Sequence, residues 1–156
     1  MLNFEIVDAA KKLSIARALK GYKAPFRLVD NYRLIDNGVD PEATVQIEAN
    51  GNIIHEAANG AGPVDALATV LKKALIPTFP YLEEIKLVDY HAAIIDASLG
   101  TATLVQVTIT FTDGTEAWKV YASSANINLA SFSALVDGFE YAILKKISDN
   151  KGSSKN

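Results

Sequence analysis

The sequence predicts an α+β fold made of two tandem βββα units, each a three-stranded antiparallel sheet with one helix, preceded by a linker helix. Three observations support this. Comparison of the chain with itself shows the order strand, strand, strand, helix twice. The central strand of each unit alternates apolar and polar residues. A hairpin turn signal follows that strand in both units, at Asn50-Gly51 and at Asp113-Gly114.

The composition restricts the classes of function. A chain of 156 residues fits one domain, which at this size buries roughly 70% of its unfolded surface. The net charge is −3 and the basic residues are scattered, which argues against nucleic acid or an anionic membrane as a partner. The absence of cysteine excludes a disulfide framework and a thiolate metal site. With no signal-peptide pattern and no apolar run near the ~20 residues that span a bilayer, we expect a cytoplasmic protein.

The N-terminal segment, residues 1–30, is expected to act as a linker. From Phe4 to Leu19 apolar residues recur every three positions between charged ones, which predicts an amphipathic helix. Gly21 is expected to end this helix, and the stretch up to Phe26 is interpreted as a connection to the main body.

The main body, residues 31–148, is predicted to hold the two units, at about 31–78 and 83–148, followed by a flexible tail over 149–156. In the first unit we expect strands Tyr32–Ile35, Ala43–Ala49 and Asn52–Ala57 and a helix Pro63–Ile76. In the second we expect strands Ile85–Ile95, Thr103–Thr112 and Glu116–Ala122, a turn at Gly100-Thr101 and a helix Ile127–Ile147. Because the central strands alternate, each sheet should bury one face under its helix. The cleft between the units is a candidate ligand site.

The loop before the first of these two helices indicates a possible anion site. Gly60 and Gly62 allow a turn, Pro63 suits the first helical position, and Asp65 lies in the first turn, where a carboxylate suits the helix dipole. The bare N–H groups of such a helix start are a natural site for a small anion, for example the carboxylate of a free amino acid. A helix start that binds nothing is the alternative, since turns of this kind are common.

The residues themselves predict no catalysis. His55 and His91 each lie in an expected strand without a second ligand at metal spacing, so both are interpreted as ordinary strand histidines. The serines have no visible partner base, and no phosphate loop or metal motif is present. Trp118 is expected in the core. The sequence therefore predicts no catalytic residue, no metal ligand and no cofactor in this chain.

Motifs in order along residues 13–145 resemble one known family. They are Gly60–Leu67, Leu87–Tyr90, Gly100-Thr101, Asp113-Gly114, Trp118, Asn126-Ile127, Ala130-Ser131 and Ala134-Leu135. Together they are similar to the C-terminal regulatory domain of the 2-isopropylmalate synthase and citramalate synthase family. The stretches Ala18–Phe26 and Glu140-Tyr141 favour the citramalate synthase branch.

The resemblance implies a domain that pairs with a second copy and binds isoleucine or leucine in a cleft near the dimer interface. Family members join this domain to a catalytic (β/α)8 barrel, which condenses acetyl-CoA with a 2-oxo acid on a divalent metal. This chain would then be an excised or free-standing feedback-inhibition domain of branched-chain amino acid biosynthesis. It would have no enzyme activity of its own, and the barrel would be its partner.

Carried over by motif, the effector pocket combines a helix start with side chains of the second unit. Its residues are Gly60, Ala61, Gly62, Val64, Asp65, Leu87, Tyr90, Ile94, Thr101, Thr103, Ser124 and Asn126. The helix-start N–H groups would take the carboxylate of the amino acid, and Asp65 or nearby carbonyls its ammonium group. The side chains of Val64, Leu87 and Ile94 would form an apolar slot.

The chain departs from the family pattern in two places. Val120 and Ala122 stand where the family has Thr-x-Gly after the tryptophan, and His91-Ala92-Ala93 replaces Lys-Val-Arg. A dimerisation or scaffold module that no longer binds an effector is therefore the alternative. Leucine and isoleucine differ only in where one methyl group branches, which an apolar slot separates by about 1–3 kcal/mol, and the citramalate-like motifs favour isoleucine.

Overall fold

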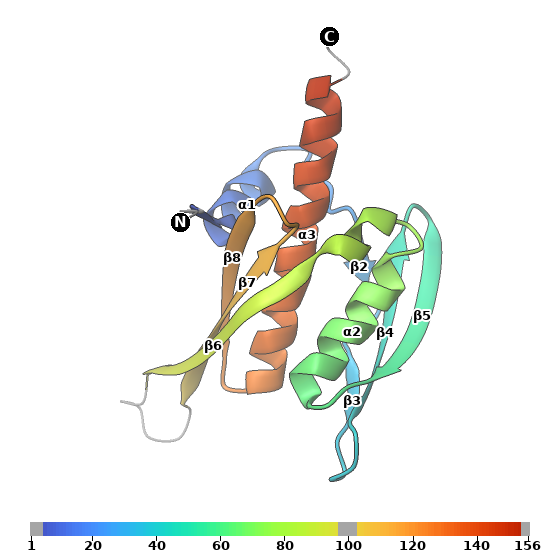
Figure 1. Ribbon diagram of the computed structural model, residues 1–156, viewed down its shortest axis with the longest axis vertical. Helices are drawn as coiled ribbons and strands as arrows, with labels where there is room; N and C mark the ends of the chain where they lie inside the picture. The colour runs from blue at the N-terminus through green and yellow to red at the C-terminus, as the bar shows by residue number, and fades with distance from the viewer. Residues whose placement is uncertain (1–4, 97–102, 154–156) are drawn as a thin grey trace.

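The computed structural model describes residues 5–96 and 103–153, which form two four-stranded sheets and three α-helices (Figure 1). The elements are β1 (Ile6–Asp8), α1 (Ala9–Ala18), β2 (Arg27–Leu28), β3 (Arg33–Ile35), β4 (Glu42–Ala49), β5 (Asn52–Asn59), α2 (Pro63–Leu75), a 3-10 turn η1 (Pro80–Glu84), β6 (Lys86–Asp96), β7 (Leu104–Thr112), β8 (Ala117–Ser124) and α3 (Ile127–Ser153). The α+β class is confirmed.

The first sheet is organised around β4, which pairs antiparallel with β5 on one side and with both β2 and β3 on the other. Every second residue of β4, including Val45 and Ile47, is buried, as the alternation predicts. Asn50 and Gly51 both have positive φ, 52° and 79°, which is the backbone of a tight type I′ hairpin and confirms that turn.

The second sheet has the strand order β1-β8-β7-β6, and β1 runs parallel to β8. The helix predicted from Phe4 therefore starts only at Ala9, because Val7 lies opposite Trp118 in the sheet. The carboxylate of Asp8 then accepts a hydrogen bond from the Lys11 amide at 3.1 Å and caps α1. Through β1 and β2 each sheet gains a fourth strand, so the expectation of three strands per sheet behind a lone leading helix is wrong.

The two long helices lie next to each other in the middle of the molecule, with one sheet on either side (Figure 1). α2 covers β4 and β5, and α3 covers β7 and β8. The core under α3 is aromatic: the Phe111 ring lies 5.6 Å from Phe139, and the Trp118 indole N–H donates to the Gly138 carbonyl at 3.1 Å. Trp118 is completely buried, so the prediction that it lies in the core is confirmed.

Several boundaries differ from the prediction. α3 continues to Ser153 rather than ending at Ile147, and β8 starts at Ala117 because a four-residue loop, 113–116, joins it to β7. The Asp113 carboxylate shapes that loop by accepting from the amides of Thr115 and Glu116. The expected turn at Gly100-Thr101 lies outside the described residues.

α3 is the one described helix that is long and apolar enough to cross a bilayer, over Ile127–Lys151. Of its most apolar window, 56% is buried inside the protein, against the sheets and α2. This burial explains the apolar composition as that of a core helix.

Candidate functional site

The start of α2 has the geometry that the glycine loop predicts. A Cβ on Gly60 would lie 2.3 Å from the Ala66 backbone nitrogen, so only glycine lets the loop approach the helix this closely. Gly62 is the N-cap and offers no side-chain acceptor, while Pro63 occupies the first helical position. The first-turn amides of Val64 and Asp65 have no acceptor within the helix and are available to an outside group.

Asp65 is already engaged in this loop. Its carboxylate accepts a hydrogen bond from the Ala61 amide at 2.9 Å, which ties the loop to the first turn of α2. The side chain is exposed, and its second oxygen faces no hydrogen-bond partner that the structure describes. Asp65 therefore both orders the loop and places a negative charge where an ammonium group can reach it.

The three predicted side chains of β6 share one face of the sheet because of a β-bulge. Leu87 lies opposite Phe111 and Tyr90 opposite Ile109, and the register shifts between them at Val88. Ile94 follows on the same face, opposite Val105. Strict alternation would have separated Leu87 from Tyr90.

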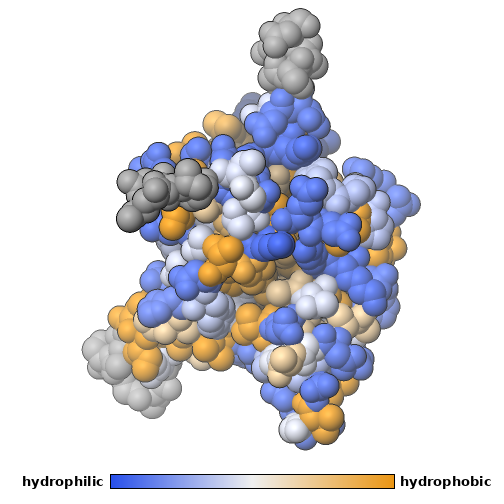
Figure 2. All heavy atoms as spheres, in the orientation of Figure 1, coloured by the Kyte–Doolittle hydropathy of each residue, from blue (hydrophilic) through white to orange (hydrophobic). Residues whose placement is uncertain are grey.

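This face of β6 is only partly covered, because α3 packs mainly on β7 and β8 and reaches the edge strand at the Tyr90–Ser131 contact. The exposed fractions are 36% for Leu87, 38% for Tyr90 and 66% for Ile94. Val88 and Ile95 are exposed as well. Figure 2 shows hydrophobic residues on the surface over β6. Exposed apolar edge strands of this kind are typical of surfaces that pair with another molecule.

A groove of about 360 Å³ runs between α2 and the beginning of β6. Its lining residues are Asp65, Ala68, Thr69 and Lys72 of α2, Ile85, Lys86 and Leu87, and Phe139 of α3. Two residues of the predicted pocket, Asp65 and Leu87, thus meet in one groove. Its walls combine apolar side chains with one carboxylate and two ammonium groups.

Lys72 holds one end of the groove by donating from Nζ to the Ile85 carbonyl at 2.8 Å. Burial lowers the pKa of this lysine, against the opposing attraction of Glu83. The predicted pocket did not include Lys72 and Phe139, because neither lies in the glycine loop or in β6. Only the tertiary packing of α2, β6 and α3 brings them together.

The predicted residues around the start of α3 form a second group. Asn126 is the N-cap, and its side-chain oxygen accepts from the amides of Asn128 and Leu129 at 2.9 and 3.2 Å. The Ser124 hydroxyl in turn accepts from the Asn126 amide. The side chains of Ser124 and Asn126 thus already cap the start of α3, whereas the Gly62 cap of α2 has no side chain that can do so.

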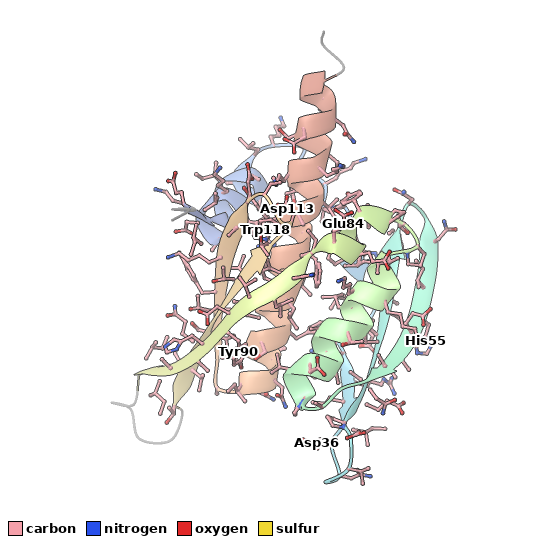
Figure 3. All side chains as sticks on the ribbon, viewed as in Figure 1. Asp36, His55, Glu84, Tyr90, Asp113 and Trp118 are labelled. Carbon is pink, nitrogen blue, oxygen red and sulfur yellow. The ribbon has the colours of Figure 1, made fainter. Side chains whose placement is uncertain are left out.

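Tyr90 connects β6 to α3. Its hydroxyl lies 2.8 Å from the Ser131 hydroxyl, which donates to the Ile127 carbonyl, so Tyr90 is the donor of the pair. Figure 3 shows Tyr90 beside the first turns of α3, while His55 lies far away on β5. The first turns of α2 and α3 lie at the same end of the molecule (Figure 1).

The predicted residues do not all meet in one place. Leu87 and Ile94 are seven positions apart on β6, which is about 23 Å along a strand. One small amino acid cannot contact both within a single chain. Thr103 is exposed just before β7, and Thr101 lies outside the described residues.

The two departures on β8 differ in their surroundings. Val120 is completely buried opposite Ile109 on the face that α3 covers, so it belongs to the core rather than to a pocket wall. Ala122 is half-buried opposite Val107. His91, on the other strand that departs, is exposed opposite Thr108 on the polar outer face. No cluster of three or more histidine, aspartate or glutamate side chains gathers in the part of the chain that the structure describes.

Comparison with known proteins identifies the family. Residues 5–143 match the model of the LeuA allosteric (dimerisation) domain. The chain is 38% identical over 157 aligned positions to a protein of Geobacter sulfurreducens named (R)-citramalate synthase, covering 97% of this chain and 30% of that protein. It is 37% identical to an (R)-citramalate synthase of Aquifex aeolicus, covering 92% of this chain and 28% of that protein.

A third relative, the (R)-citramalate synthase of Synechocystis, is 33% identical, with 90% of this chain and 27% of that protein covered. The chain thus spans somewhat less than a third of the length of the curated relatives it matches. The family model covers nearly all of the described sheets and helices. The chain belongs to the LeuA allosteric (dimerisation) domain family.

Proposed function

We propose that the chain is the feedback-inhibition domain of a citramalate synthase-like enzyme and binds a free branched-chain amino acid, isoleucine or leucine. The observation that carries this proposal is the groove between α2 and β6. It places a carboxylate and two ammonium groups beside apolar side chains, and its Asp65 belongs to the first turn of α2, whose amides lack an acceptor within the helix. A free amino acid needs charges of both signs beside a small apolar surface, and the groove is large enough to hold one.

The proposed pose follows from the charges. The carboxylate of the amino acid binds the first-turn amides of α2, where the helix dipole favours negative charge. Its ammonium group binds the free oxygen of Asp65, whose other oxygen stays on the Ala61 amide. The branched side chain lies against Ala68, Leu87 and Phe139.

We further propose that a second copy of the chain covers the exposed face of β6. β6 is the last strand of its sheet, and apolar side chains stand exposed on it from Leu87 to Ile95. A homodimer through this strand would bury them and protect the edge. It would also bring a second copy to the residues, such as Ile94, that lie too far from the groove within one chain.

Dimerisation through β6 is tested by the substitution Ile94→Lys. The lysine would bury a charge in the interface, so sedimentation velocity should show a monomer where the unchanged chain is a dimer. Val39→Lys is the matched control, because Val39 is 73% exposed on the loop between β3 and β4. Dimers of equal strength in both variants would contradict an interface at β6.

The condensing chemistry is assigned to the rest of a parent synthase. The chain covers about 30% of its relatives, and its described elements form two open sheets rather than a (β/α)8 barrel. In the parent, acetyl-CoA, a 2-oxo acid and a divalent metal would bind to a barrel, in the cytoplasm, and this domain would inhibit it. Ile15 of α1 and Leu19, the residue that follows the helix, are 58% and 64% exposed and are the proposed contact with that barrel.

A scaffold that dimerises without binding an effector is the second candidate. One observation favours it: the Asp65 carboxylate already accepts a hydrogen bond from the Ala61 amide, so the carboxylate proposed for the effector's ammonium group is partly used within the loop. In this case β6 would keep its role as an interface, and branched-chain amino acids would leave the melting temperature unchanged.

Titration calorimetry with isoleucine, leucine and valine separates the two candidates. The proposal predicts saturable heat with isoleucine or leucine. Asp65→Asn should weaken binding, while Asp36→Asn, an equal charge change on an exposed loop, should not. A ligand at 100 times its dissociation constant should also add about 2.7 kcal/mol to the free energy of unfolding. Absence of heat with all three amino acids would leave the scaffold as the remaining function.

A further inference from the structure

Arg17 fastens α1 to α3 through a charged cluster, which we call the α1–α3 joint. Arg17 Nε donates to Glu140 Oε2 at 2.9 Å, and Nη2 donates to the same oxygen at 2.6 Å. Nη2 also donates to Asp137 Oδ1 at 2.7 Å. Asp137 and Glu140 are three residues apart and lie on neighbouring positions of the α3 surface, so one guanidinium group reaches both.

The joint ties down a helix that otherwise has a small apolar contact. Of the residues of α1, Ala9 and Leu13 are buried. Glu140 is only 5% exposed, and a carboxylate at such a depth requires a cation beside it. Arg17 is the cation that the described residues place there. Moving α1 away from α3 would therefore leave the buried Glu140 carboxylate without its cation. The positions of Arg17 and of α3 thus depend on each other.

Tyr22, just after α1, adds a buried hydroxyl to the joint, next to Arg17 and Glu140. Burial, and after it the charge of Glu140, raises the pKa of Tyr22 to about 12, so the hydroxyl stays protonated. Tyr22 thus adds a neutral, buried group to the joint beside the Arg17 and Glu140 pair.

One turn of α3 belongs to the joint, the core and the groove at once. Asp137 and Glu140 hold Arg17. The Gly138 carbonyl accepts from the Trp118 indole, and the Phe111 ring fills the space beside Gly138. The next side chain, Phe139, lines the groove. Because a helical turn moves as a unit, a shift that follows loss of Arg17 also moves Phe139.

We propose that docking of α1 through Arg17 and binding of the effector in the groove stabilise each other through residues 137–140 of α3. This inference rests on the proposed function of the groove. With the joint intact, Phe139 is held where it lines the groove. When the joint is lost, Phe139 shifts, and the effector can bind only after Phe139 has returned to its place in the groove. The coupling is reciprocal, so a bound effector holds α1 more firmly against α3.

The test compares Arg17→Met with Arg27→Met. Arg27 forms an ion pair of similar length, at 2.6 Å to Glu48, but it lies on the other sheet and has no part in the α1–α3 joint. Arg27→Met loses one exposed ion pair, whereas Arg17→Met loses its pairs with both Asp137 and the buried Glu140. Calorimetry with isoleucine and leucine should show at least about fivefold weaker binding to Arg17→Met, within the usual range of coupling between sites. Binding to Arg27→Met should stay within about twofold of the unchanged chain.

Hydrogen exchange supplies the reciprocal readout, which a merely structural role of Arg17 would not produce. Saturating effector should slow exchange of the amides of Ala9–Ala18 in the unchanged chain and in Arg27→Met. It should not slow them in Arg17→Met. If Arg17→Met fails to fold, Asp137→Asn is used in its place. Asp137 is partly exposed, and this variant leaves the ion pair between Arg17 and Glu140 intact. The expected effects then have the same direction and are smaller.

The outcomes separate the two proposals. If the unchanged chain binds an amino acid and the joint variant binds it equally well, the coupling is wrong and the proposed function stands. If the unchanged chain binds none of the three amino acids, the proposed function fails, and the coupling fails with it.

Discussion

Replacing Gly60 by alanine tests whether the loop before α2 needs its close approach to the helix. The added Cβ would lie 2.3 Å from Ala66 N, 2.7 Å from Ala66 Cα and 2.8 Å from Asp65 C, and real Cβ atoms essentially never come closer than 3.0 Å. All three neighbours are backbone atoms of the first turn of α2, so no side chain can rotate away. The φ angle of Gly60 is not in the left-handed region, so the effect is purely steric.

Such overpacking against backbone costs about 1–3 kcal/mol in the free energy of unfolding. For a domain of this size, each kcal/mol lowers the melting temperature by roughly 2–4 °C, so a decrease of about 2–12 °C is expected by calorimetry. The displaced loop should also misplace the Ala61 and Asp65 contact, so binding of isoleucine or leucine should weaken together with the stability.

Gly62→Ala is the matched control two residues away. Nothing lies within 4 Å of a Cβ at Gly62, and its extended backbone, φ −143° and ψ 173°, is open to alanine. Alanine restricts the backbone of the unfolded chain, which stabilises the folded state by about 0.4–1 kcal/mol. Alanine is a poorer N-cap than glycine, which costs a similar amount, so the two effects nearly cancel. Equal melting temperatures for the Gly60 and Gly62 variants would refute the steric argument.

Two further predictions concern the core and the pH dependence of stability. Gly138→Ala should lower the free energy of unfolding, because the added Cβ would lie 2.0 Å from the buried Phe111 ring. In a double-mutant cycle, adding Phe111→Leu should recover about 0.5–3 kcal/mol of that loss. If the two substitutions change the free energy of unfolding strictly additively, the contact is contradicted. Burial opposes ionisation of Asp113, but hydrogen bonds from Lys145 and the loop amides outweigh it and hold its pKa well below the usual range. A carboxyl group with a lowered folded-state pKa stabilises above its unfolded value of about 3.9, so the deficit of Asp113→Asn in urea unfolding should be full at pH 7 and shrink below about pH 4. A deficit that does not change with pH would argue against this ion pair.

The parts of the fold that local pattern determines could be predicted from the sequence. Alternation identified the buried face of β4, and Asn50-Gly51 marked its hairpin. β1 was missed because its three residues fit a helical spacing equally well, and its partner in β8 is more than a hundred residues away. Parallel pairing over such a distance leaves no local signal.

Only part of the geometry of the candidate site could be predicted from the sequence. The glycine loop and Asp65 could be read locally, because a helix start has a recognisable composition. The bulge at Val88 could not, and it alone aligns Leu87 with Tyr90. One signal for the α1–α3 joint was present: Glu140 lies within the apolar stripe of α3, where a carboxylate indicates a buried cation. That this cation is Arg17 follows only from the tertiary structure.

The most direct test of the effector-binding account is a crystal structure of the chain grown with isoleucine well above its calorimetric dissociation constant. The account predicts a branched-chain amino acid beside the start of α2, with its ammonium group on Asp65 and its side chain against Leu87 and Phe139, and with a second copy across β6. An empty groove under those conditions, or an amino acid bound elsewhere on the chain, would contradict it.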